Sequence, residues 1–309
     1  MWLLLVVLGG VPSVDTPEGP RDATSAWCGS CHVSQFEQWR TSMHAQAATN
    51  RWYVANRSQW PLKWCNECHL PLAREEEGVG CASCHVEKKV VLTTLAPTPK
   101  GLLAHAEKKS PPLATEAACE HCHQFNMPVG QGEPEKYTQL AFQNTIAEWK
   151  AWGASRPCTS CHLPKGDHSM TGSHDRERLE RGLAVSVISK GKEEVEITLL
   201  GRKAGHAVPT GDAFRVVRVE IYDAGGMLVA RERYGHFGRA PDGTLQDLVA
   251  PPPPTDGGSS TRSFVVRAPL ARSYKVYFEF VGPLTAPLIP QHAEVLLASG
   301  RIEVEDGSP

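Results

Sequence analysis

Hydrophobic and polar positions alternate along the C-terminal part of the chain, from about residue 180 onwards. In 193–200, Val195, Ile197 and Leu199 share one face, a period of two that indicates a half-buried strand. The sequence Asp223-Ala-Gly-Gly226 favours a hairpin turn. The pattern predicts strands at 183–189, 193–200, 214–222, 227–233, 262–267, 274–281, 293–298 and 301–305. Eight short strands with turns predict an all-β, sandwich-like domain over residues 180–306.

The preceding part of the chain lacks this alternation. Phe142, Ile146 and Trp149 lie on one stripe of helical spacing, which predicts a helix over 139–153. The stretch 33–48 has helical composition and contains neither proline nor glycine. Short helices and long loops are therefore expected over residues 25–178.

The first residues are apolar and read as a secretory signal peptide over residues 1–14, with a cut after Ser13. The usual positive n-region is missing, so a disordered or packed N-terminal tail is the alternative. The apolar run from Trp2 to Leu8 is too short to span a bilayer, and the first cysteine is Cys28, too late for a lipid anchor. We expect no transmembrane anchor in the mature chain.

The composition argues against one class of function, nucleic-acid binding. The chain has 309 residues, enough for two or three domains, with 32 basic and 34 acidic side chains. This near-neutral balance argues against nucleic acid as a partner, which usually requires a strongly basic face.

The ten cysteines form five C-x-x-C pairs, and a histidine follows each pair directly. The cysteines are Cys28, Cys31, Cys65, Cys68, Cys81, Cys84, Cys119, Cys122, Cys158 and Cys161, and the histidines are His32, His69, His85, His123 and His162. C-x-x-C-H is the attachment signature of c-type haem, in which both thiols bond to the porphyrin edge and the histidine ligates the iron. The chain is predicted to carry five covalently attached haems c.

Other uses of paired cysteines fit less well. Structural zinc sites need four ligands and no histidine after every pair, thioredoxin-like motifs do not recur five times, and disulfide frameworks leave the histidines unexplained. Covalent haem is attached on the outer side of an energy-transducing membrane. We therefore expect an exported, periplasmic or otherwise extracytoplasmic protein, as the N-terminal pattern also indicates. The expected fold is α+β and multidomain: a haem-packed, mostly helical and loop domain, then the all-β domain.

Eight further histidines could fill the sixth coordination positions. His44 lies twelve residues after His32, about 18 Å along a helix, whereas two nitrogens across one metal are only about 4 Å apart. His44 is therefore predicted to ligate a neighbouring haem. The other candidate ligands lie in loops punctuated by proline or glycine: His105, His168, His174 and His206. Surface or hydrogen-bonding histidines, or thioether ligation by Met43, Met127 or Met170, remain the alternatives. We take His121, His236 and His292 as structural.

The motif Cys28-x-x-Cys31-His32, with Trp39, Ser42 and His44, resembles the C-x-x-C-H-x6-W-x2-S-x-H signature of multihaem c cytochromes. This group includes the tetrahaem electron carrier that serves hydroxylamine oxidoreductase. The segments 78–85, 143–149 and 158–164 are also similar to this group, and the loop 205–211 resembles one in cytochromes with a C-terminal β domain. The resemblance implies stacked, low-spin haems with two histidine ligands each, the sixth ligands falling on His44, His105, His168, His174 and His206. The chain departs from the carrier in having five motifs instead of four.

Two functions follow as hypotheses. The first is an electron-transfer protein, not an enzyme, whose partners are other redox proteins or cytochromes, with a membrane-associated respiratory complex as a further candidate. The alternative is a haem enzyme that reduces or oxidises a small nitrogen or sulfur compound at an iron with an open coordination position. Pentahaem nitrite reductases have lysine in place of one motif histidine, and no C-x-x-C-K occurs here.

Overall fold

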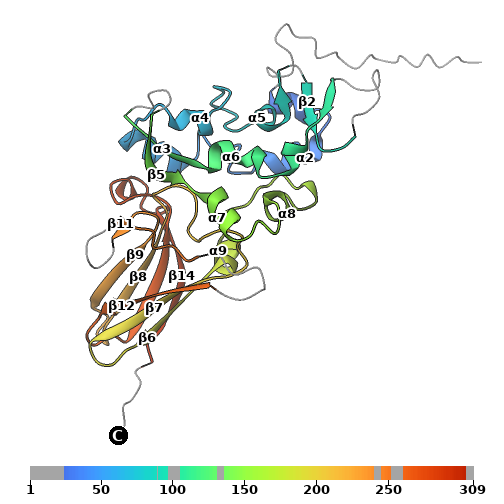
Figure 1. Cartoon of the computed structure of the whole chain (residues 1–309). Helices are drawn as coiled ribbons and strands as arrows, with labels where there is room; N and C mark the ends of the chain where they lie inside the picture. The colour runs from blue at the N-terminus through green and yellow to red at the C-terminus, as the bar shows by residue number, and fades with distance from the viewer. Residues whose placement is uncertain are drawn as a thin grey trace, which may run out of the picture.

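The structure is a computed structural model and describes residues 24–88, 90–96, 105–130, 136–239, 245–251 and 260–303. The predicted signal peptide over 1–14 lies outside the described residues. Figure 1 shows an N-terminal part of short helices above a C-terminal part made of two sheets. No helix among the described residues is long and apolar enough to cross a membrane.

The helices of the described residues are short, and several of them carry a cysteine motif. They are α1 (Ser25–Gly29), α2 (Val33–Trp39), α3 (Arg51–Gln59), α4 (Cys65–His69), α5 (Cys81–His85), α6 (Ala117–His123), α7 (Thr145–Ala151), α8 (Cys158–His162) and α9 (Arg176–Gly182). In α4, α5 and α8 the helix is the motif itself, and α6 ends on one. Residues three apart share one face of a helix, so both cysteines of such a motif lie on the same side.

Strands also occur in the N-terminal part, which corrects the expectation of a mostly helical domain. One sheet contains β1 (Val86–Glu87), β2 (Val90–Thr93) and β3 (Glu107–Lys109), and a second contains β4 (Phe125–Pro128) and β5 (Tyr137–Gln143). Among the described residues, helix accounts for 27% and strand for 30%, and the strands are distributed over several sheets. The prediction was wrong because these strands are short and pair with partners that local sequence does not reveal.

Two predicted helices are shorter than expected. The helix over 139–153 is replaced by β5 up to Gln143 and by α7 from Thr145, since pairing with β4 draws the first half into a hairpin. The helix through His44 ends at Trp39. The Trp39 indole donates to the carbonyl of Val79 at 2.9 Å, and turns follow up to Asn50, which caps α3.

The C-terminal part consists of two antiparallel sheets. The first has the order β12-β7-β6, with β6 (Leu183–Ser189), β7 (Glu194–Gly201) and β12 (Ser260–Arg267). The second has the order β14-β13-β8-β9, with β8 (Val216–Tyr222), β9 (Leu228–Tyr234), β13 (Ser273–Glu279) and β14 (Glu294–Arg301). A small ribbon joins β10 (Gly238–Arg239) to β11 (Leu245–Gln246).

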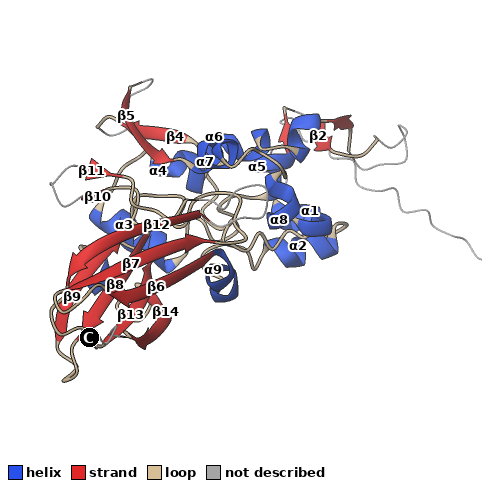
Figure 2. Cartoon of the chain, turned by 60° about the horizontal axis from the view of Figure 1, so that its bottom comes forward, coloured by secondary structure: helices blue, strands red, loops and turns tan. Residues whose placement is uncertain are grey.

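The two sheets share one buried hydrophobic cluster. Ile197 and Leu199 of β7 and Val217, Val219 and Ile221 of β8 are fully buried. Period-two alternation places these side chains on the inner faces of the strands. Figure 2 shows the two layers and α9, which contacts β6 and β14.

Candidate metal-binding histidine pairs

Four motif histidines each face a second histidine from a distant part of the chain. In each pair the ring centroids lie 6.1 to 6.3 Å apart. The pairs are His32 with His105, His123 with His44, His85 with His168, and His162 with His206. The second member of every pair is one of the predicted sixth ligands.

The spacing within the pairs fits one metal ion. A metal–imidazole bond is about 2.0–2.1 Å and the ring centroid lies roughly 1.1 Å beyond the nitrogen, so two rings across one ion are about 6.2 Å apart. Rings stacked face to face are closer, as His174 and Phe280 are at 4.6 Å. The four pairs therefore leave room for a six-coordinate iron with two axial histidines, whose other four ligands a porphyrin would supply.

Backbone carbonyls orient several of these imidazoles. The Nδ1–H groups of His85, His162 and His206 donate to the carbonyls of Leu92, Thr171 and Ala207 at 2.9 to 3.1 Å. His168 donates in the same way to Gly166 at 2.7 Å. A donor bond at Nδ1 fixes the tautomer and leaves the Nε2 lone pair for a metal.

Burial keeps most of these imidazoles neutral. It lowers the pKa of His123 to about 3 and that of His206 to about 4, and it also lowers the pKa of His44, His85 and His162. A neutral imidazole is the form that ligates a metal.

Contacts between cysteine thiols show which motifs lie beside one another. Cys28 of the first motif contacts Cys81 of the third, which raises the pKa of Cys28 and lowers that of Cys81 to about 7. Cys68 of the second motif contacts Cys122 of the fourth in the same way, and Cys119 of the fourth contacts Cys158 of the fifth. The five motifs thus form adjacent pairs within one assembly.

Within the described ranges, no cluster of three or more histidine, cysteine, aspartate or glutamate side chains is arranged to hold an ion.

His69, the fifth motif histidine, has different surroundings. Its Nδ1–H donates to the carbonyl of Ala47 at 2.8 Å, as those of His85 and His162 donate to backbone carbonyls. Its ring stacks on Tyr53, with centroids 4.1 Å apart and planes 16° apart, and the Tyr53 hydroxyl donates to Asn66 at 2.9 Å. In the part of the chain that the structure describes, no histidine ring lies opposite His69 at the spacing of the four pairs.

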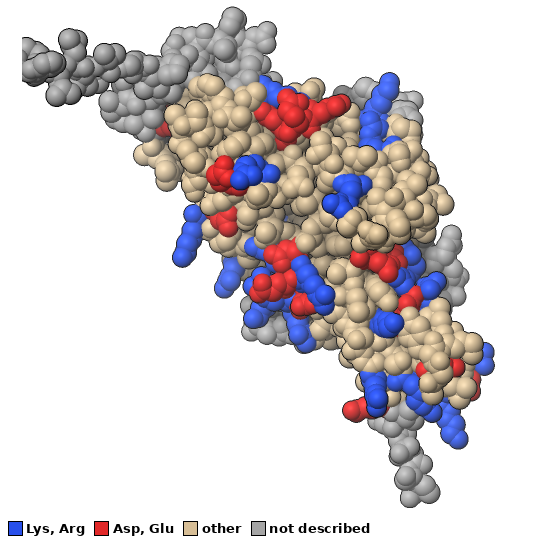
Figure 3. Space-filling view, turned by 180° about the vertical axis from the view of Figure 1, so that it is seen from behind, with Lys and Arg blue, Asp and Glu red and all other residues tan. Residues whose placement is uncertain are grey.

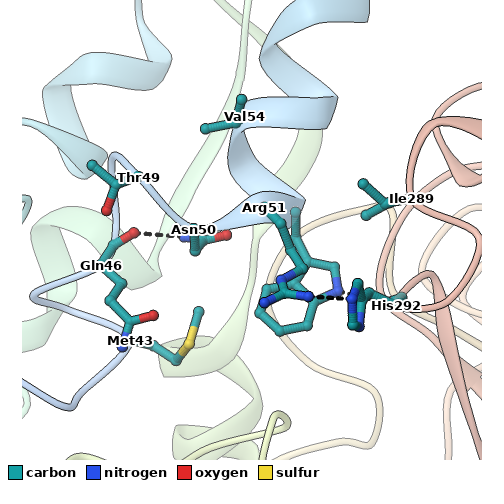
Figure 4. A pocket seen from close by; sticks show the side chains of 9 residues that line it. Met43, Gln46, Thr49, Asn50, Arg51, Val54, Ile289 and His292 are labelled. Atoms are coloured by element: carbon teal, nitrogen blue, oxygen red, sulfur yellow. Dashed lines mark hydrogen bonds between the residues drawn. The ribbon is translucent and has the colours of Figure 1, made fainter.

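His174, the remaining predicted sixth ligand, lies in an aromatic cluster. Its ring centroid is 4.0 Å from Trp52 and 4.6 Å from Phe280, and burial lowers its pKa to about 3. Trp52 also lines a hollow of about 540 Å³ beside α3, shown in Figure 4, in which Arg51 contacts His292. The structure thus brings four of the five predicted ligands, but not His174, opposite a motif histidine.

Glu148 is a site residue that the sequence did not indicate. Its carboxylate is buried and accepts hydrogen bonds from the Thr210 hydroxyl at 2.7 Å and from the backbone N–H of Ala207 at 3.1 Å. These bonds tie α7 to the loop that presents His206. Local sequence holds no signal for this role, because both partners come from the loop between β7 and β8.

His44 is positioned by a close backbone approach. The backbone N–H of Val79 donates to the His44 carbonyl at 2.9 Å. Gly78 has a φ of +57°, and a Cβ there would lie 2.7 Å from the same carbonyl oxygen. Only glycine fits this position without moving His44.

A solved structure of another protein has a similar architecture. No family model and no curated protein matches the chain. A solved structure, the penta-heme cytochrome c552 from Thermochromatium tepidum, is 21% identical, covers 92% of this chain and 100% of its own, and superposes with a TM-score of 0.64. A Bacteroides fragilis structure described as a beta-galactosidase is 11% identical over 39% of this chain and 15% of its own, with a TM-score of 0.19, too low to indicate a shared fold. The chain therefore has the fold of a multihaem cytochrome.

Proposed function

We propose that the chain is a multihaem c-type cytochrome that transfers electrons between redox partners. The observation that carries this proposal is the set of four histidine pairs at 6.1 to 6.3 Å, each containing a motif histidine. The spacing suits an iron with two axial imidazoles, which is saturated and reacts by gaining or losing an electron.

Each predicted haem has its own attachment residues. The cysteines of the five motifs would hold the porphyrins, and the histidines His32, His69, His85, His123 and His162 would supply the proximal ligands. The second ligands would be His105, His168, His44 and His206. When bound, the haems supply the reversible one-electron chemistry. The chain excludes water from their axial ligands by burial and fixes the ligand tautomers through backbone carbonyls.

Contacts between the motifs suggest the electron path. The first and third motifs touch through Cys28 and Cys81, the second and fourth through Cys68 and Cys122, and the fourth and fifth through Cys119 and Cys158. Cys84 of the third motif is near enough to Cys122 of the fourth for its charge to be felt. We infer one connected path in which the fourth motif neighbours the second, third and fifth.

The remaining parts of the proposal concern organisation and partners. We propose a pentahaem domain over residues 25–178, a β domain over 180–306 that supplies His206, and export of the mature chain. Redox proteins are the expected partners. Figure 3 shows one face of the molecule, on which side chains of both charges occur over the upper and the lower part.

Mass spectrometry of the mature protein tests haem attachment. We expect the mass to exceed that of the polypeptide by five haems and the N-terminus to follow Ser13. Absorption and electron paramagnetic resonance spectra should show low-spin haems with two histidine ligands, and the haems should be reduced and reoxidised reversibly. A protein that carries no haem, or in which every haem is high-spin, contradicts the proposal.

A second candidate function rests on His69. Tyr53, and not a histidine, is the aromatic partner of its ring among the described residues. An iron held by His69 would then keep an open position, at which a small nitrogen or sulfur compound could be reduced or oxidised. Carbon monoxide separates the two functions: a spectral change in about one fifth of the haem supports the enzyme, and an unchanged spectrum supports a carrier alone.

A further inference from the structure

Three titratable side chains form a line from the interior to the surface between the two parts of the chain. His236 Nε2 lies 3.2 Å from Glu148 Oε1, and His236 Nδ1 lies 3.3 Å from Asp247 Oδ2. The side chains of Glu148 and His236 are 7% and 8% exposed, whereas that of Asp247 is 47% exposed. The line therefore connects a buried carboxylate to water through one imidazole.

The buried end of this line lies next to a histidine pair. Glu148 accepts the hydrogen bond from the N–H of Ala207, the residue that follows His206. It also accepts from the Thr210 hydroxyl, which lies 2.8 Å from the Thr145 hydroxyl. Glu148 therefore contacts the loop that carries His206, and a charge on its carboxylate lies close to the His162–His206 pair.

The charges around the line favour a bound proton. Burial raises the pKa of Glu148, with the Thr210 bond and the charge of His236 opposing it. Burial alone would lower the pKa of His236, but contact with Asp247 and the charges of Glu148, Asp247 and Asp212 outweigh it and raise the pKa. Burial acts to raise the pKa of Asp247, but contact with His236 and the charge of Arg262 act against burial, and the pKa is lowered.

The other charges near the line are paired. Asp212 forms an ion pair with Arg215 at 3.3 Å. On the α6 side of α7, Lys150 pairs with Glu120 at 3.5 Å, exposed to water. The ion pair of Glu148 and His236 is thus joined to the His206 loop through Ala207 and Thr210.

We propose that Glu148, His236 and Asp247 form a proton-uptake path that couples reduction at the His162–His206 centre to protonation of Glu148. This inference rests on the proposed function. A haem held by His162 and His206 would take up one electron from a redox partner. One proton from water passes by way of Asp247 and His236 to the Glu148 carboxylate and forms its O–H bond. The proton offsets the added negative charge in surroundings of low dielectric, where an uncompensated charge is costly.

Reductive titrations of the haem-loaded protein at several pH values test the proposal. We expect one midpoint potential to fall as the pH rises, by up to about 59 mV per pH unit for one proton per electron. Glu148→Gln keeps an acceptor oxygen for Ala207 and Thr210 but holds no exchangeable charge, so the slope should flatten. His236→Gln should slow or reduce proton uptake. The control Glu180→Gln removes an exposed carboxylate paired with Arg176 and should leave the slope unchanged.

Proton uptake in the wild-type protein gives a second measurement that needs no variant. A pH-indicator dye should report protons taken from weakly buffered solution as the protein is reduced. Potentials that do not depend on pH, or equal slopes in wild type and Glu148→Gln, overturn the proposal. If the spectrum shows no haem with two histidine ligands, the proposed function fails instead, so the two failures are distinct.

Discussion

The imidazole rings of His162 and His206 face each other across 6.2 Å with planes only 15° apart. His162 ends α8 in the N-terminal part, whereas His206 lies in the loop between β7 and β8. The loop is held in place by Glu148 of α7. The C-terminal part therefore completes a histidine pair whose other member belongs to a cysteine motif.

Replacing His206 by methionine tests this pairing. A thioether stabilises reduced iron relative to imidazole, so His206→Met should raise the midpoint potential of one haem and leave the others unchanged. Spectroelectrochemical titration measures the shift. The control His292→Gln alters an exposed histidine beside Arg51 and should shift no potential. Five unchanged potentials in His206→Met would show that His206 is not a ligand.

His174 should contribute packing. His174→Ala removes a ring stacked between Trp52 and Phe280 and should lower the free energy of unfolding by about 1–2 kcal/mol. His174→Phe keeps the ring and removes a buried Nδ1 that has no hydrogen-bond partner, so it should restore the stability. Thermal unfolding compares the two variants. Both should retain the wild-type haem spectrum, and conversion of one low-spin haem to high-spin in both would instead assign His174 as a ligand.

Gly78 should tolerate no side chain. Gly78→Ala places a methyl group against the His44 carbonyl, so it should disturb the His44–His123 pair and alter one haem signal. Gly130→Ala is a matched control, because Gly130 has a similar φ of +61° but nothing within 4 Å of an added Cβ. Both variants lose about 1 kcal/mol to the strained backbone. An equal loss with identical spectra would show that the close approach does not position His44.

Stability should fall as the pH rises. The pKa of His236 and that of Glu148 are both raised in the folded chain, so the folded state binds more protons than the unfolded state. Their contribution is complete below the ordinary pKa of each group and is lost as the pH rises through the raised value. The melting temperature of the oxidised protein should therefore fall as the pH rises above the ordinary pKa of His236, and less steeply in His236→Gln. Parallel curves for the two proteins would contradict this assignment.

The sequence predicted the C-terminal strands well because each is encoded locally. The alternation predicted a strand over 183–189, and β6 begins and ends at these residues. The predicted strand 293–298 extends through Gly300 to Arg301 as β14, but the separate strand predicted over 301–305 was wrong, since β14 ends at Arg301 and residues 302–303 are not in a strand, while 304–305 lie outside the described residues. Glycine is required there because an added Cβ would lie 2.8 Å from the ring of Tyr274, a neighbour that the pattern does not show.

The N-terminal part was harder to predict because its contacts are nonlocal. The apolar stripe containing Phe142 fits a helix, yet Phe142 packs against Trp64 and Phe125 as part of a hairpin. Motif spacing likewise predicts that His85 is a proximal ligand, but it could not pair His85 with His168. That pairing depends on how the loops cross in space, as does the placement of Tyr53 on His69.

The hydrophobic cluster has a consequence for biosynthesis. Its buried residues run from Leu179 to Ile302, so the segment that can collapse by its own apolar surface is translated after the cysteine motifs. The first half of the polypeptide leaves the ribosome earlier, with one-turn helices that are unstable in isolation. We expect this half to stay accessible until its cysteines have been modified, and the late-folding C-terminal half then closes the molecule by delivering His206.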